Sequence, residues 1–488
     1  SMEILMIILF LVGYACIALE HTLNVNKAAS ALLLCALLWT CYIFNAPNVL
    51  PLEESFQRFV GYTSNPRIAP GMAGWESFVS SIPSLDNFHQ KVIEFVTGHQ
   101  IIEHVGDVAS ILFFLMGAMT IVELIDVHGG FSVITDRITT KNKKKLLWML
   151  SIITFFMSAI LDNLTTTIVM VMLLRKIISN FKERWVFASI IILAANSGGA
   201  FSPIGDVTTI MLWVNGNVTT GGLLPNLILP SIVSVVIPVL IVSRYLSGEV
   251  TTRERRESVS NNHLNAAELI TKKEQKIIFG MGVAALVFVP IFKAITHLPP
   301  FVGVLLGLGV LWVYTEILYH NKKNIPEGSK ARISVVIGRI DLTTILFFLG
   351  ILMAVSALQC EGILRQLAVI LDETFNGNVY AIDIIIGILS SIVDNVPLVA
   401  GSMGMYEITE VGNFAIDGTF WMFLAYCAGV GGSMLIIGSA AGVVVMGLEK
   451  VNFVWYLKNI SLIALIGYLA GAFVFIAQEE WIKPLFGF

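Results

Sequence analysis

Two aspartate–asparagine pairs stand inside apolar segments of the sequence. Asp162 and Asn163 lie in AILDNLTT, and Asp394 and Asn395 lie in SIVDNVPL. A carboxylate at the depth of a bilayer costs about 2.5 kcal/mol or more, so a repeated pair indicates a functional site. Carboxylate and carboxamide oxygens are hard ligands that suit a small cation such as Na⁺ or Li⁺. The pairs therefore predict a site that moves a small cation through a membrane.

The composition of the 488-residue chain predicts a protein that crosses a lipid bilayer many times. Hydrophobic residues make up 56% and charged residues 13% of the chain, with a mean hydropathy of +0.82. Apolar runs recur at lengths of roughly 17 to 25 residues, which cross a hydrocarbon core of about 30 Å. We expect an all-α polytopic membrane protein. The net charge of -4 comes with no basic tract that would indicate binding of nucleic acid.

Loop charges predict where the two pairs lie in the membrane. Basic residues dominate 132–145 and 175–184, so both segments belong on the cytoplasmic side. The apolar stretch 146–174 between them is too short for two crossings of about 20 residues each, and a single crossing would separate its ends. A re-entrant hairpin over 146–174 satisfies both conditions and places Asp162 at its turn. Acidic residues flank 379–406, which predicts a second hairpin that enters from outside.

The segments before the hairpins predict an internal repeat. Residues 107–115 read DVASILFFL and residues 341–349 read DLTTILFFL, but acidic residues precede the first and basic residues precede the second. Similar units in opposite orientation are the inverted repeats of secondary transporters. We expect two inverted repeats of five transmembrane helices plus one re-entrant hairpin each. They comprise residues 1–247 and 276–488, and a cytoplasmic linker, 248–275, joins them.

Each repeat is also expected to contain one broken helix. The runs 185–215 and 419–448 are apolar but are interrupted by glycine, proline and polar residues. Carbonyl groups freed by such breaks need a partner inside a membrane, and a bound cation is one such partner. Close packing of helices through small residues is the alternative explanation for the glycines. It does not explain the carboxylate of Asp206 in the first run.

The charge of these four segments predicts the sign of the ligand. They contain aspartates but no Lys, Arg or His, which favours a cation, although helix N-termini also hold anions. Asp383 lies near the outer end of its hairpin arm, where simple solvation is the alternative to a role in the site. We expect Asp162 and Asp394 to face each other across the midplane. The other expected ligands are Asn163, Asn196, Asp206, Thr208, Thr209, Ser390, Asn395 and Ser433.

Asp341 is the one expected site residue that does not belong to this set of oxygen ligands. It stands at the cytoplasmic start of its span, where it either funnels ions or is an acid favoured by the dipole of the helix. Within that set, burial and like charge favour the protonated form of a carboxyl group, so sodium and protons would compete for the same site. Exchange would follow by alternating access.

Together these motifs, above all NSGGAFSPIGDVTT at 196–209, resemble the NhaD-type Na⁺/H⁺ antiporters of the ion transporter superfamily over essentially the whole chain. The resemblance implies a homodimer in the inner membrane of a bacterium that transports Na⁺ or Li⁺ against H⁺ and needs no cofactor. Related dicarboxylate and citrate carriers typically have Ser-Asn-Thr at the hairpin tip. Asp162 and Asp394 replace that serine here, which repels an anionic substrate and favours antiport.

Three other functions remain as alternatives. A sodium-coupled dicarboxylate or anion symporter of the same superfamily is the nearest, and a passive channel is the second. A membrane-embedded enzyme is the third, but the sequence has no HExxH motif and no metal-type cluster of histidines.

Overall fold

The structure is a computed structural model of the chain. It describes residues 1–60, 85–130, 132–135, 140–160, 163–203, 205–214, 216–251, 266–392, 395, 398–399, 402–403, 406 and 408–488. Throughout these residues the regular secondary structure is helical, apart from two isolated β-bridges. The all-α class predicted from the sequence is confirmed.

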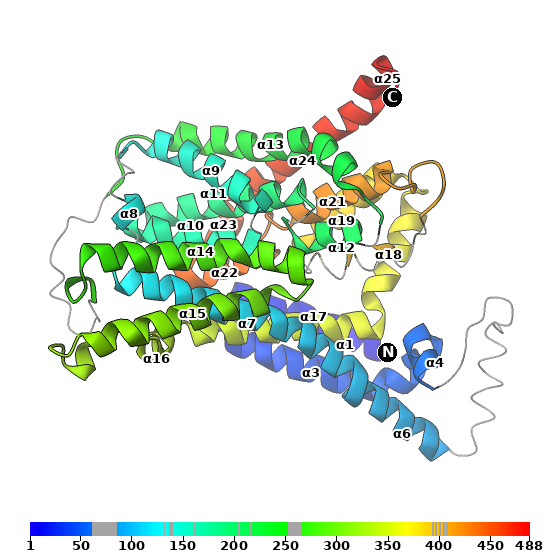
Figure 1. Ribbon diagram of the computed structural model, residues 1–488. Helices are drawn as coiled ribbons and strands as arrows, with labels where there is room; N and C mark the ends of the chain where they lie inside the picture. The colour runs from blue at the N-terminus through cyan, green and yellow to red at the C-terminus, as the bar shows by residue number, and fades with distance from the viewer. Residues whose placement is uncertain are drawn as a thin grey trace. The chain divides into compact units, whose positions relative to one another are not determined.

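The helices follow one another along the chain without intervening sheet in the described part (Figure 1). Their bounds are α1 Met2–Ala18, α2 Glu20–Leu23, α3 Lys27–Val49, α4 Glu54–Phe59, α6 Leu85–Phe95, α7 Ile101–Val127, α8 Ser132–Thr135, α9 Lys143–Ile160, α10 Asn163–Ile177, α11 Phe181–Ala200, α12 Val207–Val214, α13 Thr220–Tyr245, α14 Lys272–Thr296, α15 Pro300–Asn321, α16 Ile333–Val336, α17 Leu342–Glu361, α18 Ile363–Thr374, α19 Val379–Ser390, α21 Thr419–Gly431, α22 Ala440–Glu449, α23 Phe453–Asn459, α24 Ser461–Ala477 and α25 Lys483–Leu485. Short 3₁₀ helices lie at Leu50–Leu52, Ala266–Glu268, Glu327–Ser329 and Ile337–Arg339, and π-helical turns at Val96–Gln100 and Gln478–Ile482.

Six helices of the described chain are long and apolar enough to cross a membrane, and a bent pair raises the number to seven. The protein is thus a polytopic membrane protein. The count is lower than the ten crossings expected from the sequence because several apolar runs are divided into shorter helices. The six are Lys27–Val49, Phe88–Val127, Thr220–Tyr245, Phe301–Asn321, Leu342–Glu361 and Ser461–Leu485, and the bent pair is Ala440–Glu449 with Phe453–Asn459.

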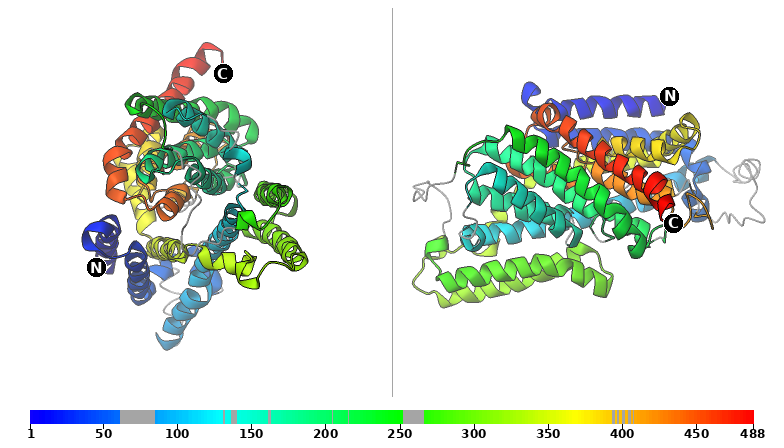
Figure 2. Two further views of the ribbon diagram at one scale, coloured as in Figure 1. Left: turned by 90° about the vertical axis from the view of Figure 1, so that its left-hand side faces the viewer. Right: turned by 90° about the horizontal axis from the view of Figure 1, so that it is seen from above.

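The chain forms two compact units. Unit 1 comprises Ser1–Leu112 and Leu346–Ile370, and unit 2 comprises Phe113–Ile345 and Leu371–Phe488. In unit 1, α1 packs along α3 (Figure 2), and the indole N–H of Trp39 donates to the carbonyl of Met353 at 2.9 Å. Each unit draws on both halves of the sequence, so these units are not the predicted repeats, whose boundaries stay a prediction.

Unit 2 contains both hairpin segments and both interrupted runs. Helix α13 lies side by side with α24 (Figures 1 and 2), and α11 packs against α9, α10, α21 and α22. The last turn of α11 and that of α21 are buried throughout. Helix α11 is therefore the central element against which the first hairpin segment is held.

Both ends of the first hairpin segment contact the same stretch of chain. The N–H of Lys143, where α9 begins, donates to the carbonyl of Gly248, and the N–H of Ser179, after α10, donates to that of Thr251. Glu183 also forms an ion pair with Lys143 at 3.3 Å and accepts the N–H of Thr251 at 3.0 Å. The two ends of the first hairpin segment therefore lie close together, and all three segments are ones whose charges predict a cytoplasmic position.

The ends of the second hairpin segment also lie together. The hydroxyl of Tyr406 donates to the carboxylate of Asp372, just before α19, at 2.6 Å. Nearby in sequence, Asp417 accepts the N–H and the hydroxyl of Thr219, each at 2.6 Å. Thr219 caps α13, whose other end is at Tyr245 beside Gly248. At 1.5 Å per residue, α13 is about 39 Å long, so the Thr219 contact and the Gly248 contacts lie at opposite ends of unit 2.

The same close approach between two backbones is found in each half of the sequence. A Cβ atom placed on Gly198, in the last turn of α11, would clash with the carbonyl of Phe155 in α9, and one placed on Gly431, where α21 ends, would clash with the carbonyl of Gly387 in α19. In both halves a glycine therefore lets the helix before the break touch the first arm of a hairpin.

The substitution Gly198→Ala is expected to destabilise the protein by about 1 to 3 kcal/mol, because the added methyl group meets backbone that cannot rotate away. Gly280→Ala in α14 is the matched control, since a Cβ placed on Gly280 would meet no atom within 4 Å. The thermal unfolding midpoints of the two purified variants in detergent check this. Equal midpoints would show that the α9 and α11 contact is looser than described.

Candidate functional site

The first interrupted run turns sharply and restarts at Asp206. Helix α11 ends at Ala200, and α12 begins at Val207. A Cβ on Gly199 would lie 2.6 Å from the carbonyl oxygen of Gly205, so the chain folds back closely on itself between the helices. Asp206 then caps α12: its carboxylate accepts the N–H of Thr208 at 3.3 Å, and its own N–H donates to the hydroxyl of Thr209 at 3.3 Å. This reciprocal pair is a capping box.

The second interrupted run has the same arrangement. Helix α21 ends at Gly431 and α22 begins at Ala440. A Cβ on Gly432 would lie 2.8 Å from the carbonyl oxygen of Gly438. Ser439 caps α22, because its hydroxyl accepts the N–H of Gly442 at 3.1 Å. Each half thus presents the start of a short helix next to a tight bend.

Five polar side chains meet at these bends. Asn163, the first residue of α10, donates from its amide to Asn196 at 3.2 Å and to the carboxylate of Asp206 at 3.3 Å. Asn196 donates in turn to the hydroxyls of Ser433 and Ser439, both at 2.9 Å. All five side chains are buried, at 8% exposure or less. We call these five residues the midplane cluster, after the position that the sequence predicts for the site.

The second hairpin segment reaches α21 at the residue beside this cluster. Ser390 and Asn395 both donate to the carbonyl of Ala428, each at 3.4 Å. A Cβ on the next residue, Gly429, would lie 2.9 Å from the Cβ of Ala200 and 3.8 Å from the carboxylate of Asp206. Both hairpin segments are therefore in contact with the region where α11 and α21 cross.

The electrostatics of this region suit both signs of charge. The starts of α12 and α22 carry partial positive charge, which stabilises the carboxylate of Asp206, and the ends of α11 and α21 carry partial negative charge. The carbonyl of Ala428 lies in the last turn of α21, where the partial charge is negative. Thr208 is fully buried, and its hydroxyl has no hydrogen-bond partner among the residues that the structure describes. Carbonyl, carboxylate and hydroxyl oxygens are the ligands that hard cations prefer.

The structure does not place every expected ligand. Asp162 and Asp394 lie outside the described residues, although α9 ends at Ile160 and α10 begins at Asn163, on either side of Asp162. Asn163, Asn196, Asp206 and Ser433 come together in the midplane cluster, and Thr208 and Thr209 adjoin it through the cap. Ser390 and Asn395 meet at Ala428. Ser439 was not among the expected ligands, since its role as a cap depends on where α22 begins.

Asp341 makes its contacts elsewhere. It accepts the N–H and the hydroxyl of Thr344 at the start of α17 and pairs with Lys450 at 2.5 Å. Burial alone would raise the pKa of Asp341, but the Lys450 ion pair and the Thr344 hydrogen bonds hold it below its usual value. Its carboxylate is thus an N-terminal helix cap that also lines a cavity of about 200 Å³ with Glu123, Arg175 and Arg339.

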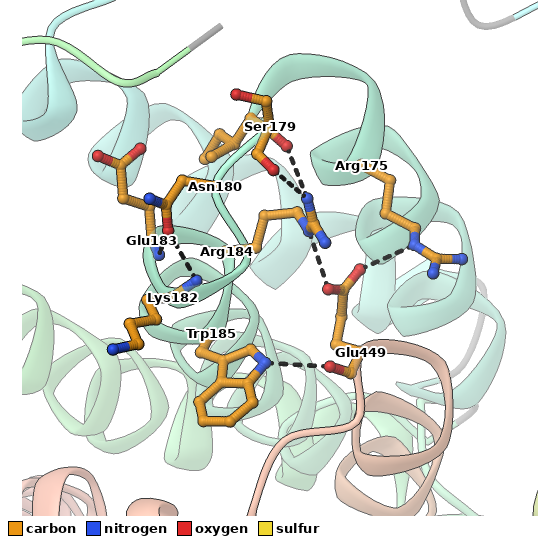
Figure 3. A network of polar contacts seen from close by, with 9 residues as sticks. Arg175, Ser179, Asn180, Lys182, Glu183, Arg184, Trp185 and Glu449 are labelled. Atoms are coloured by element: carbon orange, nitrogen blue, oxygen red, sulfur yellow. Dashed lines mark hydrogen bonds and ion pairs between the residues drawn. The ribbon is translucent and has the colours of Figure 1, made fainter. Parts of the chain in front are cut away.

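A buried ion-pair network fastens the end of α10 to α22 (Figure 3). The carboxylate of Glu449, whose side chain is 0% exposed, pairs with Arg175 at 3.1 Å and Arg184 at 2.9 Å. Arg184 also donates to the carbonyls of Ile178 and Ser179, each at 3.0 Å. The network joins the return arm of the first hairpin segment to the second broken run.

Replacement of Glu449 by glutamine is expected to destabilise the folded protein by about 3 kcal/mol, because two arginines lose their buried counter-charge. Glu410→Gln is the matched control, since Glu410 is exposed and forms no ion pair within the described chain. Thermal unfolding in detergent measures both. Unchanged stability of the Glu449 variant would contradict a structural role for the network.

Comparison with known proteins identifies the family of the chain. A family model described as "Citrate transporter" (CitMHS) matches residues 7–416. Sodium/proton antiporter 1 of Arabidopsis thaliana is 42% identical over 98% of this chain and 73% of its own length, and sodium/proton antiporter 2 of the same plant is 40% identical over 98% of this chain and 100% of its own. The Na⁺/H⁺ antiporter NhaD of Vibrio parahaemolyticus is 31% identical over 77% of this chain and 91% of its own length.

The chain belongs to the NhaD family of transporters. This confirms the family resemblance stated from the motifs. These relatives are named as transporters, and none of them is named as an enzyme.

Proposed function

We propose that this protein exchanges Na⁺ or Li⁺ for H⁺ across a membrane by alternating access. The observation that carries the proposal is the midplane cluster, in which the carboxylate of Asp206 and the amides of Asn163 and Asn196 meet where two short helices begin. Asp162 and Asp394 complete the site as the residues that bind Na⁺ and protons in turn, with Asn163 and Asn395 as further ligands of Na⁺. The names of the full-length relatives support the same assignment.

The membrane arrangement proposed here is a pair of inverted repeats. Each has five crossings, one re-entrant hairpin and one broken helix. The contacts of both ends of the first hairpin segment with 248–251 support re-entry, and so does the contact between Tyr406 and Asp372. The repeated glycine approaches at Gly198 and Gly431 support a common ancestral unit. Movement of the part of the protein that carries the hairpins relative to the bilayer would then expose the site to each side alternately.

Competition between sodium and protons follows from the charges of the site. Two aspartates in a poorly solvated place repel each other, so protonation relieves the repulsion and sodium binding does the same. Exchange of two protons for one sodium would move one net charge, worth about 2.3 kcal/mol per 100 mV of membrane potential. This is the stoichiometry that we propose.

Assembly and location complete the proposal. We propose a homodimer without a cofactor, in the inner membrane of a bacterium, as expected from the family resemblance. The two relatives from Arabidopsis make a plant membrane the alternative location. Asp341 is proposed to guide cations at the cytoplasmic entrance, where it lines the charged cavity.

Everted membrane vesicles from a bacterial strain without its own Na⁺/H⁺ antiporters provide the test. A pH-sensitive dye reports the interior acidified by respiration, and addition of NaCl or LiCl should release protons within seconds in vesicles that contain the protein. Choline chloride serves as the control. A response that requires added dicarboxylate would instead support the sodium-coupled symporter, and proton release without a saturable dependence on Na⁺ would support a channel.

A further inference from the structure

A second buried carboxyl group lies outside the midplane cluster. Asp383 is one turn inside α19, and its side chain is 0% exposed. Neither of its carboxyl oxygens has a hydrogen-bond partner within the described chain. The interpretation of Asp383 as a solvated acid at the outer end of the hairpin arm is therefore wrong in this structure.

Among the residues that the structure describes, the surroundings of Asp383 contain no counter-charge. Helix α19 packs against α21, and the hydroxyl of Tyr468 in α24 donates to the carbonyl of Ile384 at 2.8 Å. The titratable groups that face Asp383 are Cys427, Tyr468 and Tyr406. All three are neutral at ordinary pH, and Tyr406 is engaged with the next acid, Asp372. No lysine, arginine or histidine of the described part forms an ion pair with Asp383.

Burial without a partner strongly favours the neutral form of such a group. An ionised carboxylate without a partner is far more costly to bury than a neutral carboxyl group without a hydrogen bond. A proton is therefore the simplest ligand that makes the buried position tolerable.

We propose that Asp383 is a second proton-binding site of the exchanger, separate from the sodium site at the hairpin tips, and that it carries one of the two protons exchanged for each sodium ion. Asp383 lies seven residues before Ser390 in the same helix, a rise of about 10 Å, between the outer end of the arm and the cluster. The carboxylate takes a proton from water when the arm is exposed to the outside, is buried as the neutral acid in the conformation described here, and releases the proton to water on the cytoplasmic side when the arm is next exposed there. This inference rests on the proposed antiport.

Infrared difference spectroscopy of the purified protein tests whether the proton is held. The C=O stretching band of a protonated carboxylic acid should be present at neutral pH in the wild-type protein and should lose one carboxyl equivalent in Asp383→Asn. Glu410→Gln, which removes an exposed acid, should leave the band unchanged. An identical band in wild type and Asp383→Asn would overturn the proposal.

Reversal of transport in proteoliposomes tests whether that proton is carried. The sodium gradient that balances a fixed pH gradient gives the ratio of protons to sodium, and Asp383→Asn should lower this ratio by one proton. An unchanged ratio would overturn the transport role. If Asp383→Asn has no exchange activity, Asp383→Glu decides: restored exchange supports the proposal, and inactivity of both counts against it.

The two measurements separate this inference from the proposed function. The infrared band does not depend on any transport, so its absence would refute proton binding at Asp383 while Na⁺/H⁺ exchange by the wild type still stood. Failure of the wild-type protein to exchange Na⁺ for H⁺ would refute the proposed function and, with it, the transport role of Asp383.

Discussion

Asparagine in place of Asp162, or in place of Asp394, is expected to abolish Na⁺/H⁺ exchange. Each carboxylate is proposed to bind the sodium ion and the proton that replaces it, and an amide takes neither charge. The loss of one carboxylate interaction at about 4 Å is worth about 4 kcal/mol at an effective dielectric constant of 20. Sodium affinity would therefore fall by up to roughly a thousandfold.

Membrane insertion should be intact in both variants, because removal of a charge from an apolar segment lowers its cost of insertion. The dye response of everted vesicles measures exchange, and the amount of protein extracted as a single species by detergent measures insertion. Normal exchange in both variants at wild-type protein levels would refute the assignment of these aspartates.

The second large effect is expected at Asp206. Asp206→Asn should reduce exchange by at least about tenfold, because the carboxylate that Asn163 contacts loses its charge in a site shielded from water. Asparagine is nearly as good a helix cap as aspartate, so the variant keeps the hydrogen bond to the N–H of Thr208 and with it the start of α12.

Thermal unfolding separates charge from structure in this variant. The unfolding midpoint of Asp206→Asn should be close to that of the wild type, whereas Asp206→Ala, which loses the cap, should be less stable by about 1 kcal/mol. Full exchange activity of Asp206→Asn would show that Asp206 serves only as a cap.

The sequence indicated several polar residues that the structure brings together. Glycine, proline and polar residues in apolar runs indicated where helices are interrupted, and the breaks lie after Ala200 and Gly431. The cost of burying polar groups in a membrane indicated that Asn163, Asn196 and Asp206 belong together, and their side chains are in contact.

Other features depend on the fold and have no local signal. Ser439 joins the cluster only because α22 begins beside it, and serine is common between packed helices. The network around Glu449 unites residues far apart in sequence, and Asp383 was ambiguous because hydropathy does not reveal what covers one side of a helix. An apolar run also does not show where its helix breaks, so the lengths of the helices could not be predicted from hydropathy.

Sodium binding to the purified protein as a function of pH tests the central claim most directly. Below the pKa of the site, competition between sodium and protons should make the apparent dissociation constant for Na⁺ depend on pH. If sodium displaces one proton, this constant should rise about tenfold for every unit by which the pH falls, and if it displaces two protons, about a hundredfold. A dissociation constant that stays the same between pH 6 and pH 9, or a variant without both Asp162 and Asp394 that binds Na⁺ normally, would contradict it.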